Sequence, residues 1–348
     1  MYNTHLYGGE GKDELLEEIK NRFQEIYESI TSIEKYVDED DVLTYTLRVF
    51  FNSLGESNAL NKITYILSGV EYDPIVFIKE FTEYLAKSFA ALKTFFCEDG
   101  KEYIEVHSLV TLGRFGIVIP FIVKAYNYGL LKEEICSLCS ALETLVLRHR
   151  LIGTKANLIT RIEDVYEKFN AENHSIKDIC DRINLMKIVP GSNWWYAYWN
   201  NDALEYALRG GLEHSIAKYI LWKYENWLKN NGKSGYSFTR FDSIDRPHLE
   251  HIAPQKPTDG EPIAAGYSVY DEKFVMECID CLGNYLLLSA PHNESIGNKS
   301  FKQIKRPSYT QLIQQLEIVK LTENDEVWDR AKIETRNNVL KEYVLNNI

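Results

Sequence analysis

Apolar residues recur at intervals of three and four through most of the first 230 residues, and no other feature restricts the possible folds so strongly. In the first such stretch, acids and lysines separate Leu16, Ile19, Phe23, Ile26 and Ile30. This spacing gathers apolar side chains on one face of an α-helix. The apolar–polar alternation that is typical of strands is not sustained in this part of the chain. The pattern therefore predicts a bundle of eight or more helices.

Gly, Ser and Asn accumulate where this helical pattern stops. The stretch from residue 230 to residue 245 contains Gly232 and Gly235, and such a composition marks a loop or a domain boundary. At 348 residues the chain is long enough for two domains. We expect a helical bundle domain over residues 1–235 and a second domain over residues 236–348.

Hydropathy and charge argue against two classes of protein. The longest apolar run, residues 115–123, contains Pro120 and is far shorter than the roughly 20 residues of a membrane-spanning helix. The polar N-terminus lacks the apolar core of a signal peptide, so we expect a cytoplasmic protein that does not contact a membrane. The net charge of −12 argues against a protein that coats nucleic acid without specificity.

Three strings that combine a few polar residues with an apolar frame follow one another in the second half of the chain. They read Leu-Glu-His-Ile-Ala-Pro-Gln at 249–255, Leu-Gly-Asn-Tyr-Leu-Leu-Leu at 282–288 and Asn-Glu-Ser-Ile-Gly-Asn-Lys-Ser-Phe-Lys at 293–302. Phosphodiester hydrolysis needs such a set, because a neutral imidazole can take a proton from water while a divalent cation neutralises charge on the phosphate. Carboxylate and amide oxygens suit a hard cation such as Mg²⁺.

These strings resemble the HNH (His-Me finger) nuclease domain of GmrSD-type modification-dependent restriction endonucleases. The first string is intact, with Glu250 as the acid before the histidine. The second departs from the family pattern, because Tyr285 and Leu286 stand where Leu and Thr are usual. The third keeps Asn293 and Asn298 in an Asn-rich segment that contains lysine. The helical region before the strings is also similar to that of this family in position and length.

The resemblance implies two catalytic residues. His251 is the expected general base, because an imidazole with a pKa near neutrality can be neutral and still accept a proton. Asn284 corresponds to the central Asn of the motif, which holds the loop and orients the histidine. The alternatives are a core histidine bonded to a carbonyl group and an Asn that only completes a turn.

The resemblance also implies ligands for Mg²⁺ or Mn²⁺. Glu250 and Asn293 are the expected ligands, Asn298 is the competitor of Asn293, and the adjacent His292 could substitute. Glu250 and His251 would point to opposite faces of a strand. They can serve one metal centre only if the strand ends there and the backbone turns.

A positively charged segment follows Asn298. This basic segment consists of Lys299, Lys302, Lys305 and Arg306, and no acid lies between its first and last residues. In isolation, such a run is usually a solvated helix face. Beside the three strings, it is expected to contact phosphate groups of DNA.

The implied fold is mainly α. A multi-helix bundle would be followed by a small ββα-metal (His-Me finger) nuclease domain and by C-terminal helices. We expect strands at 247–252 and 284–288, a crossing helix that begins at residue 298, and helices near 308–319 and 325–346.

Two Cys-x-x-Cys pairs raise the possibility of a structural zinc site. Cys136 and Cys139 form one pair, and Cys278 and Cys281 form the other. Both pairs lie in helical patterns with apolar neighbours, which buried free cysteines explain adequately. A structural Zn²⁺ is therefore not expected.

The leading hypothesis is a metal-dependent DNA endonuclease in bacterial restriction or anti-phage defence, with modified phage DNA as a possible substrate. Two alternatives are an RNA-cleaving HNH protein and a non-catalytic interaction subunit with a degenerate nuclease domain. Family members usually carry an N-terminal nucleotide-dependent domain with an Asp-Gly-Gln-Gln-Arg-like string, which this sequence lacks. We expect a separate subunit to supply that function, or the chain to be a fragment or a reduced variant.

Overall fold

The computed structural model describes most of the chain as two compact units. Unit 1 comprises Met1–Val146 and Lys155–Tyr196, and unit 2 comprises Leu147–Thr154 and Ala197–Ile348. The described residues are 12–69, 73–113, 116–230, 238–257 and 261–348. The predicted domain junction between residues 235 and 236 lies outside these residues and stays a prediction.

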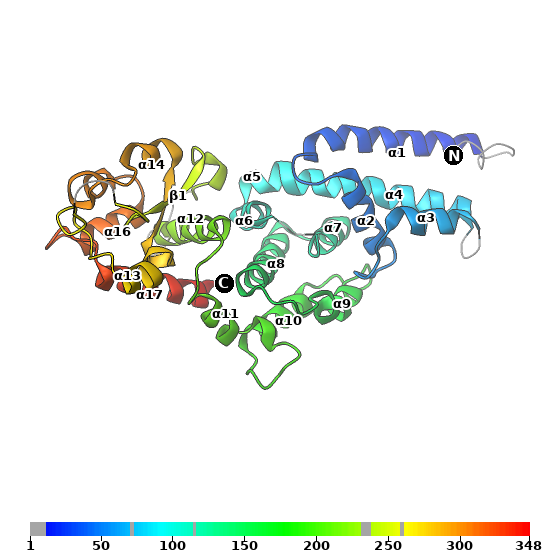
Figure 1. Cartoon of the computed structure of the whole chain (residues 1–348). Coiled ribbons are helices and arrows are strands. Elements are labelled where there is room, and N and C mark those ends of the chain that lie inside the picture. Colours follow the sequence, from blue (N-terminus) through cyan, green and yellow to red (C-terminus); the bar gives the residue numbers. More distant parts are fainter. Residues whose placement is uncertain (1–11, 70–72, 114–115, 231–237, 258–260) are drawn as a thin grey trace. The chain divides into compact units, whose positions relative to one another are not determined.

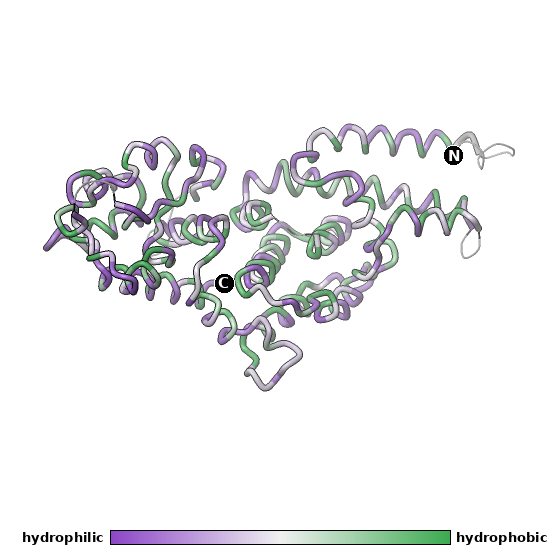
Figure 2. The backbone as a smooth tube through the Cα atoms, viewed as in Figure 1, coloured by the Kyte–Doolittle hydropathy of each residue, from purple (hydrophilic) through white to green (hydrophobic). Residues whose placement is uncertain are grey.

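Unit 1 is built from helices (Figure 1). In chain order they are α1 (Lys12–Ile33), α2 (Glu39–Phe50), α3 (Ala59–Leu67), α4 (Pro74–Lys93), the π segment η1 (Thr94–Asp99), α5 (Gly100–Glu102), α6 (Ile104–Leu112), α7 (Ile119–Asn127), most of α8 (Lys132–Ile152), α9 (Ile159–Lys168) and α10 (Lys177–Ile188). Polar and apolar residues are interspersed along α1 (Figure 2). Helix α1 packs on α4. The helical bundle predicted from the spacing is confirmed.

Helix α4 illustrates how the sequence fixes these elements. The Asp73 carboxylate accepts hydrogen bonds from the backbone N–H groups of Ile75 at 2.9 Å and Val76 at 3.0 Å, which caps the helix start. The buried rings of Phe77 and Phe81 lie one turn apart and stack with their centroids 5.1 Å apart. A cap and an apolar face together therefore place α4 in the core of unit 1.

Unit 2 combines both short and long helices with a two-stranded sheet. After the end of α8 it contains η2 (Ala197–Trp199), α11 (Asn201–Ala207), α12 (His214–Asn230), η3 (Phe241–Ser243), β1 (Pro247–His251), α13 (Glu272–Phe274), η4 (Val275–Ile279), η5 (Leu282–Asn284), β2 (Tyr285–Ser289), α14 (Ala290–Ile296), η6 (Phe301–Lys305), α15 (Arg306–Ser308), α16 (Ile313–Leu321) and α17 (Arg330–Asn347). The chain is therefore mainly α, as predicted. No helix in the described part is long and apolar enough to cross a membrane.

The two predicted strands form an antiparallel pair. Leu249 faces Leu287 across the sheet, Glu250 faces Leu286, and His251 faces Tyr285 at the end of the ladder. Helix α12 packs against both strands. This pairing brings the first two strings of the sequence side by side.

The structure contains a helix that was not predicted, α14, which begins at Ala290 directly after β2. The helix predicted to begin at residue 298 corresponds to η6, which begins at Phe301. Pro291 lies in the first turn of α14, where a missing N–H costs no hydrogen bond, and Gly297 ends that helix with a φ of 45°. Asn293 consequently lies on α14, whereas Asn298 lies between α14 and η6.

The core of unit 2 surrounds the sheet and η5. Its apolar members include Ile252, Leu286, Leu288 and Trp328, all fully or almost fully buried. Helix α17 lies so close to Gly283 that a Cβ atom there would be 2.3 Å from the Ile333 carbonyl oxygen. The glycine of the second string is thus required for the packing of α17 on η5.

Candidate active site

Asn284 ties the segment after β1 to the core. Its side-chain amide donates to the carbonyl groups of Ala253 at 2.8 Å and Ile279 at 2.9 Å. Its Oδ1 accepts from the Ala253 N–H at 2.8 Å and from Trp328 Nε1 at 3.0 Å. The side chain is fully buried, and both its amide group and its Oδ1 atom bond to other residues of unit 2. This position suits an Asn that holds the turn after His251, as the resemblance implies.

His251 closes β1 with its ring on the face opposite Glu250. Its Nε2 lies 2.9 Å from Asp280 Oδ1. The Tyr285 ring contacts the imidazole edge-on, with the centroids 4.9 Å apart and an interplanar angle of 89°. Burial lowers the pKa of His251, although the hydrogen bond to Asp280 opposes this effect. The imidazole is therefore neutral near pH 7, as a general base requires.

Asp280 was not singled out from the sequence. Burial raises the pKa of its carboxyl group, but hydrogen bonds from His251 and Gln255 outweigh burial, and the net pKa is lowered. Gln255 Nε2 lies 3.3 Å and the Tyr285 hydroxyl 3.5 Å from the same Oδ1 atom. No motif marks an acid at this position. A search for acids near the second string would have included it, although nothing in the sequence pairs it with His251.

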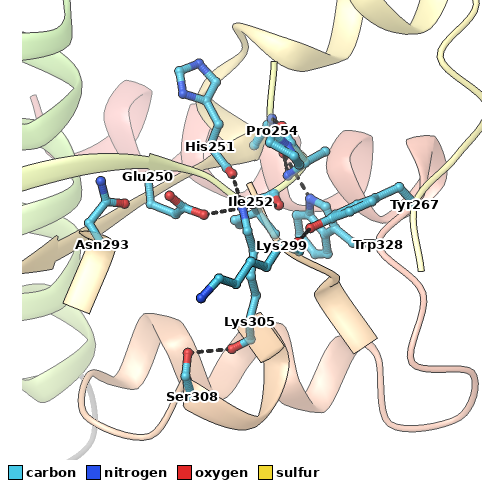
Figure 3. Close-up of polar contacts among 12 residues, drawn as sticks. Glu250, His251, Ile252, Pro254, Tyr267, Asn293, Lys299, Lys305, Ser308 and Trp328 are labelled. Atoms are coloured by element: carbon cyan, nitrogen blue, oxygen red, sulfur yellow. Dashed lines mark hydrogen bonds and ion pairs between the residues drawn. The ribbon is translucent and has the colours of Figure 1, made fainter. Parts of the chain in front are cut away.

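Glu250 points to the other face of β1 and pairs with a member of the basic segment. Lys305 Nζ donates to Glu250 Oε1, to the His251 carbonyl at 2.9 Å and to the Ile252 carbonyl at 3.1 Å (Figure 3). Both side chains are buried, with 7% of the Glu250 side chain exposed. Burial raises the pKa of Glu250 to about 7, against the opposing effect of the Lys305 ammonium group. Burial likewise lowers the pKa of Lys305.

Asn293 lies on the Glu250 side of the strand. Its Nδ2 is 3.3 Å from Nδ1 of His248, which shares a strand face with Glu250 because the two residues are separated by one position. The Asn293 Oδ1 is buried and has no hydrogen-bond partner among the described residues. Figure 3 shows Asn293 and Glu250 on one side of β1 and the His251 ring directed away from them.

The two competitors of Asn293 have different surroundings. His292 Nε2 lies 2.9 Å from the Ser308 hydroxyl group, and burial lowers the pKa of His292. Asn298 is exposed beyond the end of α14. The structure therefore does not bring Asn298 onto the helix that carries Asn293.

The basic segment divides into exposed and internal members. Lys299 is exposed, and 53% of the Lys302 side chain is exposed although its Nζ lies 3.1 Å from Glu326. Arg306 is mostly covered and also faces Glu326, at 3.5 Å. Lys305 is fully buried. Only Lys299 and Lys302 are thus placed to meet a phosphate group from solvent.

The described residues contain no group of three or more His, Cys, Asp or Glu side chains that could hold a metal ion. The six cysteines are free. Cys136 and Cys139 lie on α8, in unit 1, whereas Cys278 and Cys281 lie in unit 2.

The chain is similar to a known protein family in one region. No curated protein and no solved structure matches the chain. Residues 195–343 match the family model described as the C-terminal domain of GmrSD restriction endonucleases. This range includes His251, Asn284 and Asn293. The C-terminal part of the chain is therefore similar to the C-terminal domain of the GmrSD restriction endonucleases.

Proposed function

We propose that the chain is a metal-dependent DNA endonuclease that uses HNH chemistry through unit 2. The observation that carries this proposal is the position of His251 within the matched range, at the end of a strand and against a carboxylate. The match to a restriction endonuclease family supports DNA as the substrate. Bacterial restriction or anti-phage defence, in the cytoplasm, is the proposed setting.

In the proposed reaction, His251 takes a proton from a water molecule, whose oxygen then attacks the phosphorus atom. The bond from phosphorus to the leaving 3′ oxygen breaks, and that oxygen acquires a proton from solvent. The pKa of His251 is lowered by burial, which keeps the imidazole ready to accept the proton at neutral pH. Asn284 maintains the backbone turn that positions the ring, through its bonds to Ala253.

Asn293 and Glu250 each have an oxygen atom that could bind Mg²⁺ or Mn²⁺, on the face of β1 opposite the His251 ring (Figure 3). The buried, unpartnered Oδ1 of Asn293 is a suitable ligand atom. Glu250 Oε1 accepts from Lys305, while no described residue donates to Glu250 Oε2. When bound, the cation would supply Lewis-acid stabilisation of the phosphate and the leaving oxygen. Asn293 and Glu250 are therefore the proposed ligands, and Asn298 stays the alternative to Asn293.

Two features of the family extend the proposal. Modified phage DNA is the proposed preferred substrate, and a separate nucleotide-dependent subunit is the proposed partner. Both rest on the similarity of residues 195–343 to the GmrSD C-terminal domain. Lys299 and Lys302 would position the backbone of the DNA, because they are the exposed members of the basic segment.

The test is nicking of supercoiled plasmid and of modified phage DNA in the presence of Mg²⁺ or Mn²⁺. His251→Ala should reduce the rate by about 10²- to 10⁴-fold, and a chelator should abolish cleavage. His174→Ala removes an exposed imidazole of unit 1 and should leave the rate unchanged. Cleavage that survives His251→Ala at the wild-type rate would refute the assigned base.

A further inference from the structure

Three donor groups converge on one oxygen of Asp280. His251 Nε2 lies 2.9 Å from Oδ1, Gln255 Nε2 lies 3.3 Å away, and the Tyr285 hydroxyl group lies 3.5 Å away. The Asp280 side chain is 57% exposed, whereas that of His251 is only 15% exposed. The carboxylate therefore sits between the covered imidazole and solvent, with its orientation restrained from two further directions.

This contact determines which ring nitrogen of His251 carries the proton. An ionised carboxylate can only accept hydrogen bonds, and the pKa of Asp280 is lowered, chiefly by its hydrogen bonds from His251 and Gln255 against the opposing effect of burial. A neutral imidazole that bonds to Asp280 through Nε2 must therefore carry its hydrogen on Nε2. Nδ1 is then the basic nitrogen, and it makes no hydrogen bond to any residue that the structure describes.

We propose that Asp280 is a positioning residue for the general base, holding His251 in the Nε2–H tautomer so that Nδ1 accepts the proton from water. This inference rests on the nuclease function proposed for unit 2 and extends it to the orientation of the base. A carboxylate that fixes the tautomer of a catalytic histidine contributes strongly to the rate of other hydrolases, although it never contacts the substrate.

The two residues that restrain Asp280 come from the strings of the sequence. Gln255 ends the first string, and Tyr285 stands in the second string where Leu is usual in the family. The Tyr285 ring contacts the imidazole at 4.9 Å and its hydroxyl group reaches Asp280 at 3.5 Å. Tyr285 thus contacts both His251 and Asp280. A Leu at this position has no hydroxyl group and could not reach Asp280 in this way.

The direct test is the ¹⁵N NMR spectrum of the His251 ring in the full chain without metal at pH 8, where the imidazole is neutral. Loss of the signals in His251→Ala assigns them. The wild type should show a protonated Nε2 and an unprotonated Nδ1. In Asp280→Ala, both shifts should move toward those of an imidazole that exchanges between tautomers. Glu261→Gln, which removes an exposed carboxylate elsewhere in unit 2, should leave the spectrum unchanged. A protonated Nδ1 in the wild type, or unchanged shifts in Asp280→Ala, would overturn the proposal.

Kinetics separate a positioning role from a ligand role. Asp280→Ala should lower kcat on the order of 10²- to 10⁴-fold and change KM by less than about threefold, while Asp280→Glu recovers part of the loss. The affinity for Mn²⁺, measured by calorimetry, should not change in Asp280→Ala. A parallel loss of Mn²⁺ binding would make Asp280 a metal ligand and overturn the proposal. If the wild type cleaves no DNA, the nuclease function fails, whereas the spectrum still decides the role of Asp280.

Discussion

Glu250 and Lys305 form a buried ion pair on the face of β1 that lies opposite the His251 ring. The Lys305 ammonium group also bonds to the carbonyl groups of His251 and Ile252. One side chain thus neutralises the acid of the first string and holds the backbone at the point where β1 ends. The ion pair fixes the segment that carries the proposed base.

Removing Lys305 should destabilise unit 2. Lys305→Met removes the counter-charge, so the buried Glu250 carboxyl group must either stay ionised without it or take up a proton at pH 8. Either change should lower the free energy of unfolding, by about 3–5 kcal/mol. The double variant Glu250→Gln/Lys305→Met removes the carboxyl group as well and should recover much of the loss. Urea unfolding of the three proteins measures both effects. A single variant as stable as the wild type would show that the ion pair makes no net contribution.

Asn284→Ala should be destabilising for a different reason. It leaves Trp328 Nε1, the Ala253 N–H and the Ile279 carbonyl in the core without the partners that they have now. Each buried polar group that loses its partner costs about 1–3 kcal/mol, so the loss for these three groups should be about 3–9 kcal/mol. Thermal unfolding monitored by tryptophan fluorescence is a suitable measurement. Asn193→Ala, at a loop position of unit 1, is the control.

Gly283→Ala tests the contact of α17 with η5. A Cβ atom at this position would lie 2.3 Å from the Ile333 carbonyl oxygen and 2.8 Å from the Asn337 backbone nitrogen. Backbone atoms cannot yield as a flexible side chain can, so the variant should lose about 3 kcal/mol of stability or more. Gly191→Ala is the matched control, because no atom lies within 4 Å of its added Cβ. Equal unfolding midpoints for the two variants would contradict this packing.

The elements of the fold could be predicted because local patterns determine them. The spacing of apolar residues indicated the helices of unit 1, and the resemblance to the nuclease fold indicated β1. Helix α14 was not predicted, because Pro291 in its first turn and the conformation of Gly297 at its end decide where it starts and stops. The spacing of apolar residues does not predict the backbone conformation of a single glycine.

The side-chain pairs of the site could not be predicted, because they depend on three-dimensional neighbours. Asp280 belongs to no string, and it meets His251 only through the pairing of β1 with β2 and the turn held by Asn284. Lys305 matched a phosphate-binding pattern by charge alone. Its burial beside Glu250 follows from the packing of η6, which a run of charges does not encode.

The stability of unit 2 should decrease with acidification through His149. Trp199 Nε1 donates to His149 Nδ1 at 3.1 Å, and burial lowers the pKa of the imidazole. The unfolded chain then binds more protons below about pH 6.5. The stabilisation from neutral His149 is therefore complete above this pH and is lost as the pH falls through the native pKa. In His149→Gln, the free energy of unfolding should fall less steeply between pH 7 and pH 5. Parallel profiles for the two proteins would disprove the assignment.

The exposure of the basic segment leads to a prediction about DNA binding. Lys302 keeps half of its side chain in solvent, whereas Lys305 is buried against Glu250. Lys302→Gln should weaken binding of DNA of any sequence and reduce the slope of log K against log salt by about one. Its unfolding midpoint should stay close to that of the wild type, because exposed ion pairs such as that with Glu326 contribute little. Fluorescence anisotropy with labelled duplex DNA at several salt concentrations measures the slope. An unchanged slope would mean that Lys302 does not contact phosphate, and Lys299→Gln would then test the other exposed lysine.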